Sequence, residues 1–321
     1  MGRYEELRVV AFGGGTGLPV LLRGLRDRVG DLTAVVTVAD DGGSSGRLRQ
    51  ELGVAPPGDV RNCLVALAGR RKLAEVFNYR FEGGGELSEH SVGNIIIAAL
   101  ADMAGGFCEG VEQAALFLRI KGQVYPAATE SLTLVVSHAD GTVTRGESVI
   151  REVGKAVASV EVEPKHAAAP PGVLAAIERA DVVVLSPGSL FTSTIPALLG
   201  TGVREALADF AGPVVYAANV MTQPGETVGF ALSDHLRALA DHAGPVLTDV
   251  LVHSGGLPED LISRYEAEGG APVEVDREEI EKLGIRLREA VLLSREAESL
   301  GVRHDPERLA EEVCEAALVR L

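Results

Sequence analysis

The sequence predicts an α/β protein with a Rossmann-like, mostly parallel, doubly wound sheet. Apolar, β-branched segments of strand length alternate with amphipathic segments of helical period along most of the 321 residues. The first apolar segment breaks into four glycines and a threonine at 13–17 and then continues as a helix. A second unit of the same kind, an apolar strand followed by a loop of glycine and hydroxyl residues, occupies 181–194. This alternation, with a glycine turn after a strand, is typical of nucleotide-binding α/β folds.

The first βαβ unit is expected at strand 7–12, helix 18–28 and strand 32–38. Its crossover should be right-handed and its strands parallel. The glycine turn places backbone N–H groups at a helix N-terminus, where the helix dipole attracts phosphate. Glycine also permits close approach, because it has no Cβ.

Helices are predicted throughout the middle of the chain, at 60–68, 72–81, 91–103 and 108–118. Asp59 and Ser91 have the residue types of N-caps. The segment 60–120 is too long for one crossover, so we expect a helical subdomain inserted beside the sheet.

A β-hairpin appendage is predicted next, after a short strand at 124–126. Strands at 131–138 and 142–146 flank Asp140-Gly141, which is a strong hairpin signal. The three prolines in 161–171 indicate a loop.

The alternation resumes in the C-terminal half, and we expect a single domain over 1–321. The expected elements are helix 173–180, strand 181–185, strand 213–218, helix 231–242, strand 246–252, helix 258–265, strand 272–275 and a last helix from 306.

Composition and charge exclude several classes of function. The net charge of −16 argues against a nucleic-acid surface, which needs a basic stripe. Three dispersed cysteines and no signal-peptide pattern are typical of a cytoplasmic protein. No apolar run is long enough to span a membrane.

Three loops that follow strands should meet at one edge of the sheet: 13–17, 40–49 and 186–194. The first loop is not a dinucleotide fingerprint, because Leu18 stands where the third glycine belongs, and it is not a Walker A loop. Asp40 follows at about the distance of a ribose-binding acid, so NAD(P) remains an option, although a weaker one. Asp40 and Asp41 could instead hold Mg²⁺ or form a solvated turn. Ser189 could contact a phosphate or cap the helix that follows.

Six motifs resemble one family, the YvcK group of the CofD-like superfamily, known as gluconeogenesis factors. The motifs are FGGGTGL (12–18), TVADDGGSSGRLR (37–49), PPGDVRNCLVAL (56–67), HSVGN (90–94), SPGSLFT (186–192) and NVMTQPGET (219–227). The resemblance implies a Rossmann-like fold and a cytoplasmic protein needed for gluconeogenic growth, cell-wall synthesis and cell shape. It also implies binding of nucleotide-diphosphate sugars such as UDP-N-acetylglucosamine.

The resemblance carries ligand contacts to matching positions. It implies roles for the glycine loop, the acidic pair, Tyr265 and Arg303. Some relatives have a phosphorylatable threonine where this chain has Pro306, which excludes phosphorylation at that position. The expected ligand-binding residues are Gly13, Gly14, Gly15, Thr16, Gly17, Asp40, Asp41, Ser44, Arg47, Asn62, Asn94, Gly188, Ser189, Asn219, Tyr265 and Arg303.

Two functions from different classes remain open. The first is a regulator that binds a nucleotide-diphosphate sugar and signals to enzymes of cell-wall or carbon metabolism. The second is a transferase of a phosphorylated metabolite with Mg²⁺ at Asp40, as in the related 2-phospho-L-lactate transferases. The apolar helices within 91–118 favour a homodimer.

Overall fold

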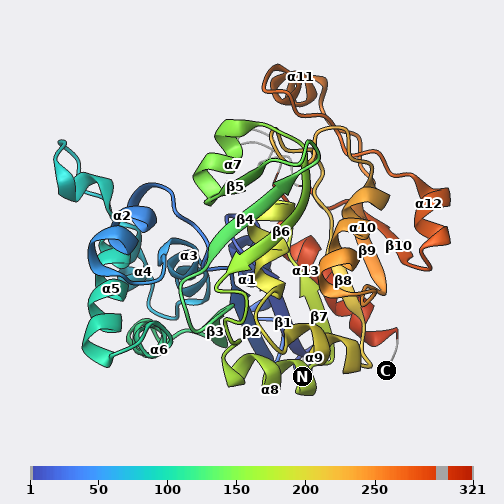
Figure 1. Ribbon diagram of the computed structural model, residues 1–321. Helices are drawn as coiled ribbons and strands as arrows, with labels where there is room; N and C mark the ends of the chain where they lie inside the picture. The colour runs from blue at the N-terminus through green and yellow to red at the C-terminus, as the bar shows by residue number, and fades with distance from the viewer. Residues whose placement is uncertain (1–2, 294–302, 320–321) are drawn as a thin grey trace.

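The computed structural model describes residues 3–293 and 303–319, and it confirms the Rossmann-like α/β fold (Figure 1). Seven strands form the main sheet in the order β10-β9-β8-β7-β1-β2-β3, and every pairing between neighbours is parallel. The strands are β1 (Arg8–Gly13), β2 (Asp31–Val36), β3 (Gln123–Pro126), β7 (Val182–Leu185), β8 (Val214–Ala217), β9 (Asp249–His253) and β10 (Arg286–Ala290).

Helices cover both faces of this sheet, as right-handed crossovers in opposite directions require. Helices α1, α3 and α13 pack together on the sheet, and α8 and α9 form a second group. The helices are α1 (Gly17–Leu25), α2 (Gly43–Leu52), α3 (Gly58–Leu67), α4 (Arg71–Asn78), α5 (Val92–Ala104), α6 (Phe107–Leu118), α7 (Glu147–Val153), α8 (Pro171–Arg179), α9 (Val203–Asp209), α10 (Leu232–Ala243), α11 (Glu259–Ala267), α12 (Arg277–Lys282) and α13 (Pro306–Leu318).

The direction of the strand order reverses between β1 and β7. From β1 the chain proceeds to β2 and β3 on one side, and from β7 it proceeds to β8, β9 and β10 on the other. Such a reversal sends the connections that follow the two strands in opposite directions and leaves a crevice outside the carboxyl ends of the strands. The glycine loop after β1 and the loop after β7 therefore face each other.

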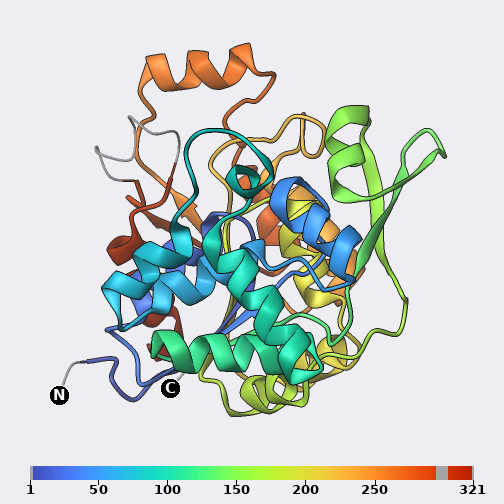
Figure 2. The ribbon, with the colours of Figure 1, turned by 90° about the vertical axis from the view of Figure 1, so that its left-hand side faces the viewer.

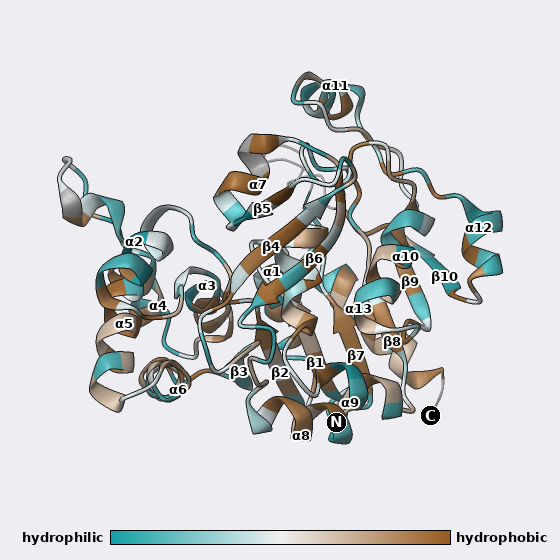
Figure 3. Cartoon of the chain, viewed as in Figure 1, coloured by the Kyte–Doolittle hydropathy of each residue, from teal (hydrophilic) through white to brown (hydrophobic). Residues whose placement is uncertain are grey.

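The core lies along the inner strands. All four residues of β7 and all four of β8 are buried. Figure 3 shows the inner strands as mostly hydrophobic, whereas the outlying α12 is mostly hydrophilic. Burial on both faces explains why the inner strands are continuous apolar runs rather than alternating ones.

The inserted helices α3 to α6 form a layer beside the sheet (Figure 2). Ser91 caps α5 as predicted, since its Oγ accepts a hydrogen bond from the N–H of Asn94 at 3.3 Å. The expectation that the segment is too long for one crossover was wrong. The chain returns to β3, which pairs directly with β2, so the whole layer lies within one β2–β3 connection.

The predicted hairpin is confirmed as β4 (Thr133–His138) and β5 (Val143–Arg145), which pair antiparallel. A third strand, β6 (Val157–Glu163), pairs with the other edge of β4. The first three residues of the loop expected at 161–171 therefore belong to this strand. The strand expected at 272–275 makes only isolated bridges, through Pro272 and Glu274.

Candidate functional site

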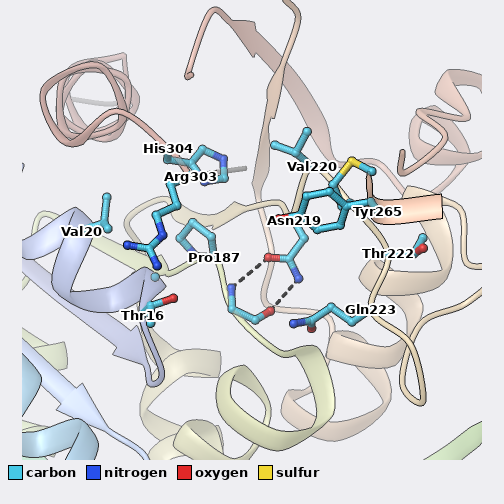
Figure 4. A pocket seen from close by; sticks show the side chains of 13 residues that line it. Thr16, Val20, Pro187, Asn219, Val220, Thr222, Gln223, Tyr265, Arg303 and His304 are labelled. Atoms are coloured by element: carbon cyan, nitrogen blue, oxygen red, sulfur yellow. Dashed lines mark hydrogen bonds between the residues drawn. The ribbon is translucent and has the colours of Figure 1, made fainter. Parts of the chain in front are cut away.

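A cleft lies outside the carboxyl ends of β1 and β7, where the strand order reverses. It consists of two adjoining cavities of about 300 Å³ and 550 Å³. Both cavities are lined by Thr16, Gly188, Thr222, Gln223 and Tyr265. The smaller cavity is completed by Gly17, Val20, Pro187, Asn219, Val220, Met221, Arg303 and His304 (Figure 4). The larger is completed by Gly15, Asp40, Asp59, Glu147, Ser189, Ser193, Pro224, Glu226 and Glu268.

The glycine loop divides into a packed part and a part that faces the cleft. A Cβ on Gly13 would lie 2.1 Å from the Ser186 Oγ, and one on Gly14 would lie 2.4 Å from the Thr37 side chain. These two glycines are tight packing positions and do not line either cavity. Gly15 and Gly17 do line the cleft, so only residues 15–17 of the loop expected at 13–17 face it.

Two contacts fix the cleft-facing part of this loop. Gly15 has a φ of +58°, which favours glycine, and its N–H donates a 2.6 Å hydrogen bond to Asp59 Oδ2. At Gly17 the backbone approaches the neighbouring loop so closely that a Cβ would lie 1.7 Å from the Pro187 carbonyl oxygen. The loops after β1 and β7 can thus pack in direct contact because residue 17 has no side chain.

Asp59 was expected to cap a helix, and this prediction was wrong. The residue before α3 is Pro57, and Asp59 lies within the first turn. Its carboxylate instead reaches the Gly15 N–H and lines the larger cavity. Capping is a local pattern, whereas the Gly15 N–H that donates to Asp59 lies 44 positions away in the sequence.

Asn219 holds the loop that follows β7. Its Nδ2 donates to the Gly188 carbonyl at 2.6 Å, and its Oδ1 accepts from the Gly188 N–H at 2.9 Å (Figure 4). Because both polar ends of the amide are used, a ligand would contact the loop that Asn219 orients. Ser189 does not cap the following turn through its side chain, and its Oγ accepts a 3.1 Å hydrogen bond from Gln223 Nε2.

Arg303 and Tyr265 bring the C-terminal part of the chain to the cleft. Figure 4 shows Arg303 extended towards Thr16 and Pro187, with Tyr265 across the cavity beyond Asn219. Arg303 forms no ion pair with any other residue that the structure describes. Beside it, burial, with a further effect of His253, lowers the pKa of His304 to about 4. His304 is therefore neutral near pH 7, and Arg303 supplies the positive charge of this cavity.

Carboxylates dominate the larger cavity. Glu226 is buried and accepts hydrogen bonds from the Phe191 N–H and the Thr192 hydroxyl, both at 3.1 Å. Asp40 Oδ1 accepts from the Gly42 N–H at 2.9 Å. No group of three or more metal-ligating side chains occurs within the described residues. Mg²⁺ commonly uses one or two carboxylates together with substrate phosphates and water, and Asp40 fits that mode of binding.

Five expected site residues have side chains that do not line the two cavities. Asp41 Oδ1 accepts from the Ser148 N–H at 2.8 Å, at the start of α7. Ser44 contacts His90 Nδ1 at 3.0 Å and Asn94 Nδ2 at 2.9 Å, which joins α2 to α5. Arg47 pairs with Glu89, and Asn62 Oδ1 accepts from Arg61 at 2.6 Å. The contacts of Asp41, Ser44, Asn94 and Arg47 connect different elements, whereas that of Asn62 stays within α3.

Several cleft residues were not predicted. Thr222, Gln223 and Glu226 belong to the NVMTQPGET motif, so the signal was present although only Asn219 was chosen from it. Glu147 gave no local signal, because its place in the cleft depends on how the antiparallel sheet packs.

A family model described as 2-phospho-L-lactate transferase CofD matches residues 9–293. The chain belongs to the CofD family. The gluconeogenesis factor of Halalkalibacterium halodurans is 46% identical over 283 residues, which is 88% of each chain. The gluconeogenesis factor of Bacillus subtilis is 41% identical over 308 residues, covering 95% of this chain and 96% of that one. The resemblance to the YvcK-type gluconeogenesis factors within the CofD family is thus confirmed.

Solved structures agree with this family. A crystal structure of a UPF0052 family protein from Bacillus halodurans has a TM-score of 0.91 and 43% identity, covering 98% of this chain and 99% of that chain. Among the residues that the structure describes, no helix of this CofD family member is long and apolar enough to cross a membrane.

Proposed function

We propose that this chain binds a nucleotide-diphosphate sugar resembling UDP-N-acetylglucosamine and acts as a regulator of gluconeogenic growth, cell-wall synthesis and cell shape. The observation that carries the proposal is the meeting of the glycine loop, Asn219, Tyr265 and Arg303 in one cleft. Cavities of about 300 Å³ and 550 Å³ in direct continuity have the size that small-molecule sites require.

The charges of the cleft suit such a ligand. The N–H groups around Thr16 and Gly17 lie at the start of α1, and Arg303 adds a full positive charge beside them. A diphosphate would gain from both. Asp40 would accept hydrogen bonds from ribose or sugar hydroxyls, and the Tyr265 ring would contact the ligand from α11.

Calorimetry with UDP-N-acetylglucosamine tests this proposal. Removal of a charge-assisted contact by Arg303→Ala should weaken binding by about tenfold or more. Arg145→Ala removes the same charge from β5, where Arg145 pairs with Glu163 outside the cleft, and should leave binding unchanged. Absence of binding at millimolar ligand, or equal binding by wild type and Arg303→Ala, would contradict the assignment.

The alternative is a Mg²⁺-dependent transferase of a phosphorylated metabolite, as the description of the CofD family suggests. Asp40 would hold Mg²⁺, which would shield phosphate charge. Mass spectrometry of reactions with candidate phosphorylated substrates should then reveal a product that requires Mg²⁺ and is lost in Asp40→Asn. A product that persists in that variant would exclude this role for Asp40.

We further propose a cytoplasmic homodimer that signals to enzymes of cell-wall or carbon metabolism. Met103 and Leu116 of the helical layer are 82% and 70% exposed, and Phe117 is also exposed. Such side chains favour an interface between copies of the chain. Light scattering after chromatography should give the mass of a dimer for wild type and of a monomer for Leu116→Glu. A wild-type monomer would contradict this expectation.

A further inference from the structure

The two cavities of the cleft have opposite charge. Among the described residues, Arg303 is the single charged side chain that lines the smaller cavity. Five carboxylates line the larger cavity: Asp40, Asp59, Glu147, Glu226 and Glu268. Asp40, Asp59 and Glu226 accept hydrogen bonds from the protein, and carboxylates ordinarily carry negative charge at neutral pH. A ligand with an anionic end and a neutral end therefore has one favoured orientation.

The five carboxylates are here called the acidic wall. Of these, Glu147 belongs to the antiparallel appendage, which consists of β4, β5, α7 and β6. It is the first residue of α7, and it is 8% exposed although it lines the larger cavity. No other part of the appendage contributes a side chain to the two cavities within the described residues. The position of α7 therefore decides whether this carboxylate is part of the site.

Asp41 holds α7 in place. Its Oδ1 accepts the 2.8 Å hydrogen bond from the Ser148 N–H, at the end of the helix where N–H groups lack helical partners. Its Oδ2 lies where a Cβ on Gly146 would come within 2.3 Å, and Gly146 has a φ of +93°. The start of α7 is thus packed directly on this carboxylate. Asp40, the preceding residue, lines the cleft itself. Two consecutive residues therefore act on the same cavity: Asp40 lines it, and Asp41 holds the helix that carries Glu147.

We propose that Asp41 is a positioning residue for Glu147, and that the wall so completed selects a nucleotide sugar with an uncharged, hydroxyl-rich sugar against one whose sugar carries a carboxylate. Sugar hydroxyls donate hydrogen bonds that carboxylates accept, whereas a second carboxylate in the same cavity is repelled. The diphosphate would lie towards Arg303 and the sugar towards Glu147. This inference rests on the proposed function.

Selection is tested by calorimetry with UDP-N-acetylglucosamine and UDP-glucuronic acid in buffer containing EDTA. The wild type should bind the glucuronic acid compound at least about tenfold more weakly, because like-charge contacts are costly. Glu147→Gln should narrow the ratio of the two dissociation constants. Glu161→Gln is the matched control, since Glu161 is an exposed residue of β6 that pairs with Lys165 outside the cleft. Equal affinities in the wild type, or equal narrowing by both variants, would overturn the selection.

Positioning is tested separately with Asp41→Ala and Asp41→Asn. Asp41→Ala should narrow the ratio of the two dissociation constants, as Glu147→Gln does. Asp41→Asn should keep most of the wild-type ratio, because its amide oxygen can still accept a hydrogen bond from the Ser148 N–H. Hydrogen exchange at the Ser148 amide in the ligand-free protein should be faster in Asp41→Ala than in wild type. Unchanged exchange and an unchanged ratio would refute the role of Asp41. If neither nucleotide sugar bound the wild type, the proposed function and the selection would both fail, and the exchange measurement would still decide the positioning.

Discussion

Replacement of Gly17 by alanine should separate the two loops that form the cleft. A Cβ at this position would lie 1.7 Å from the Pro187 carbonyl oxygen, whereas ordinary contacts begin near 3.4 Å. The loops would therefore have to move apart by a distance comparable to that difference. Gly17 does not have a positive φ, so the effect is steric and not conformational.

The expected loss of stability follows from overpacking, which typically costs about 1–3 kcal/mol. Alanine at the first position of α1 favours the helix and offsets part of this cost, by up to about 1 kcal/mol. A net loss of about 1–2 kcal/mol is therefore expected. Because displacements near 1 Å in a site have large effects, ligand affinity should fall on the order of tenfold or more.

Gly105→Ala is the matched control. Gly105 follows α5 with a φ of +78° and has no atom within 4 Å of an added Cβ. It should lose a similar 1–2 kcal/mol through backbone strain alone, roughly as left-handed residues do. The two variants should thus show similar losses of unfolding free energy in urea. Calorimetry with UDP-N-acetylglucosamine should show a loss of affinity for Gly17→Ala but not for Gly105→Ala. Wild-type affinity in Gly17→Ala would refute the steric reasoning.

Three further predictions concern polar groups that are buried or half-buried. Asp59→Ala should destabilise the protein by about 1–3 kcal/mol in urea unfolding, because the Gly15 N–H loses its partner. Glu226→Ala should cost a similar amount, about 1.5–3 kcal/mol, since two donors, including the Thr192 hydroxyl, lose a charged acceptor. Burial lowers the pKa of His235 to about 4, well below its ordinary value. The unfolded chain then binds a proton that the folded chain does not, so stability should fall as the pH drops from about 6.5 to 4, by roughly 3 kcal/mol for this one group.

Each of these outcomes has a clear contrary result. Unchanged unfolding midpoints in Asp59→Ala or Glu226→Ala would show that water replaces the lost acceptor. His235→Gln removes the titrating group, so its stability should depend less on pH than that of the wild type over the same range. Identical pH dependence in the two proteins would assign the effect to other groups.

The main sheet could be predicted largely from sequence because its inner strands are buried on both faces. Segment 181–185, for example, is apolar at four of its five positions, and Val182–Leu185 forms β7 close to the expected position. The edge strand β10, Arg286–Ala290, was missed for the opposite reason. It has no buried residue, and charged side chains occupy three of its five positions. Strand β6 was missed because glutamates occupy two of its seven positions.

The candidate site could be predicted where a loop follows an inner strand, as with Thr16, Asp40 and Gly188. Residues that act over long sequence separation could not be assigned in this way. Asp41 was expected beside Asp40 in the site, but its partner is Ser148, which lies 107 positions away. A local sequence pattern indicates which hydrogen-bonding groups a side chain can pair with. The tertiary fold decides which of those groups lie close enough to do so.

Helix α13 packs against α1, so the cleft is complete only when residues far apart in the sequence have both been synthesised. Gly24 of α1 lies so close to α13 that an added Cβ would come within 1.9 Å of the Pro306 carbonyl oxygen. The ribosome synthesises the glycine loop before Arg303, which precedes this helix. A nascent or truncated chain lacks one side of the cleft, so mass action by a ligand can stabilise only the finished protein. A ligand of the cleft would then protect chains that contain both sides of it against proteolysis and would not protect fragments that lack one side.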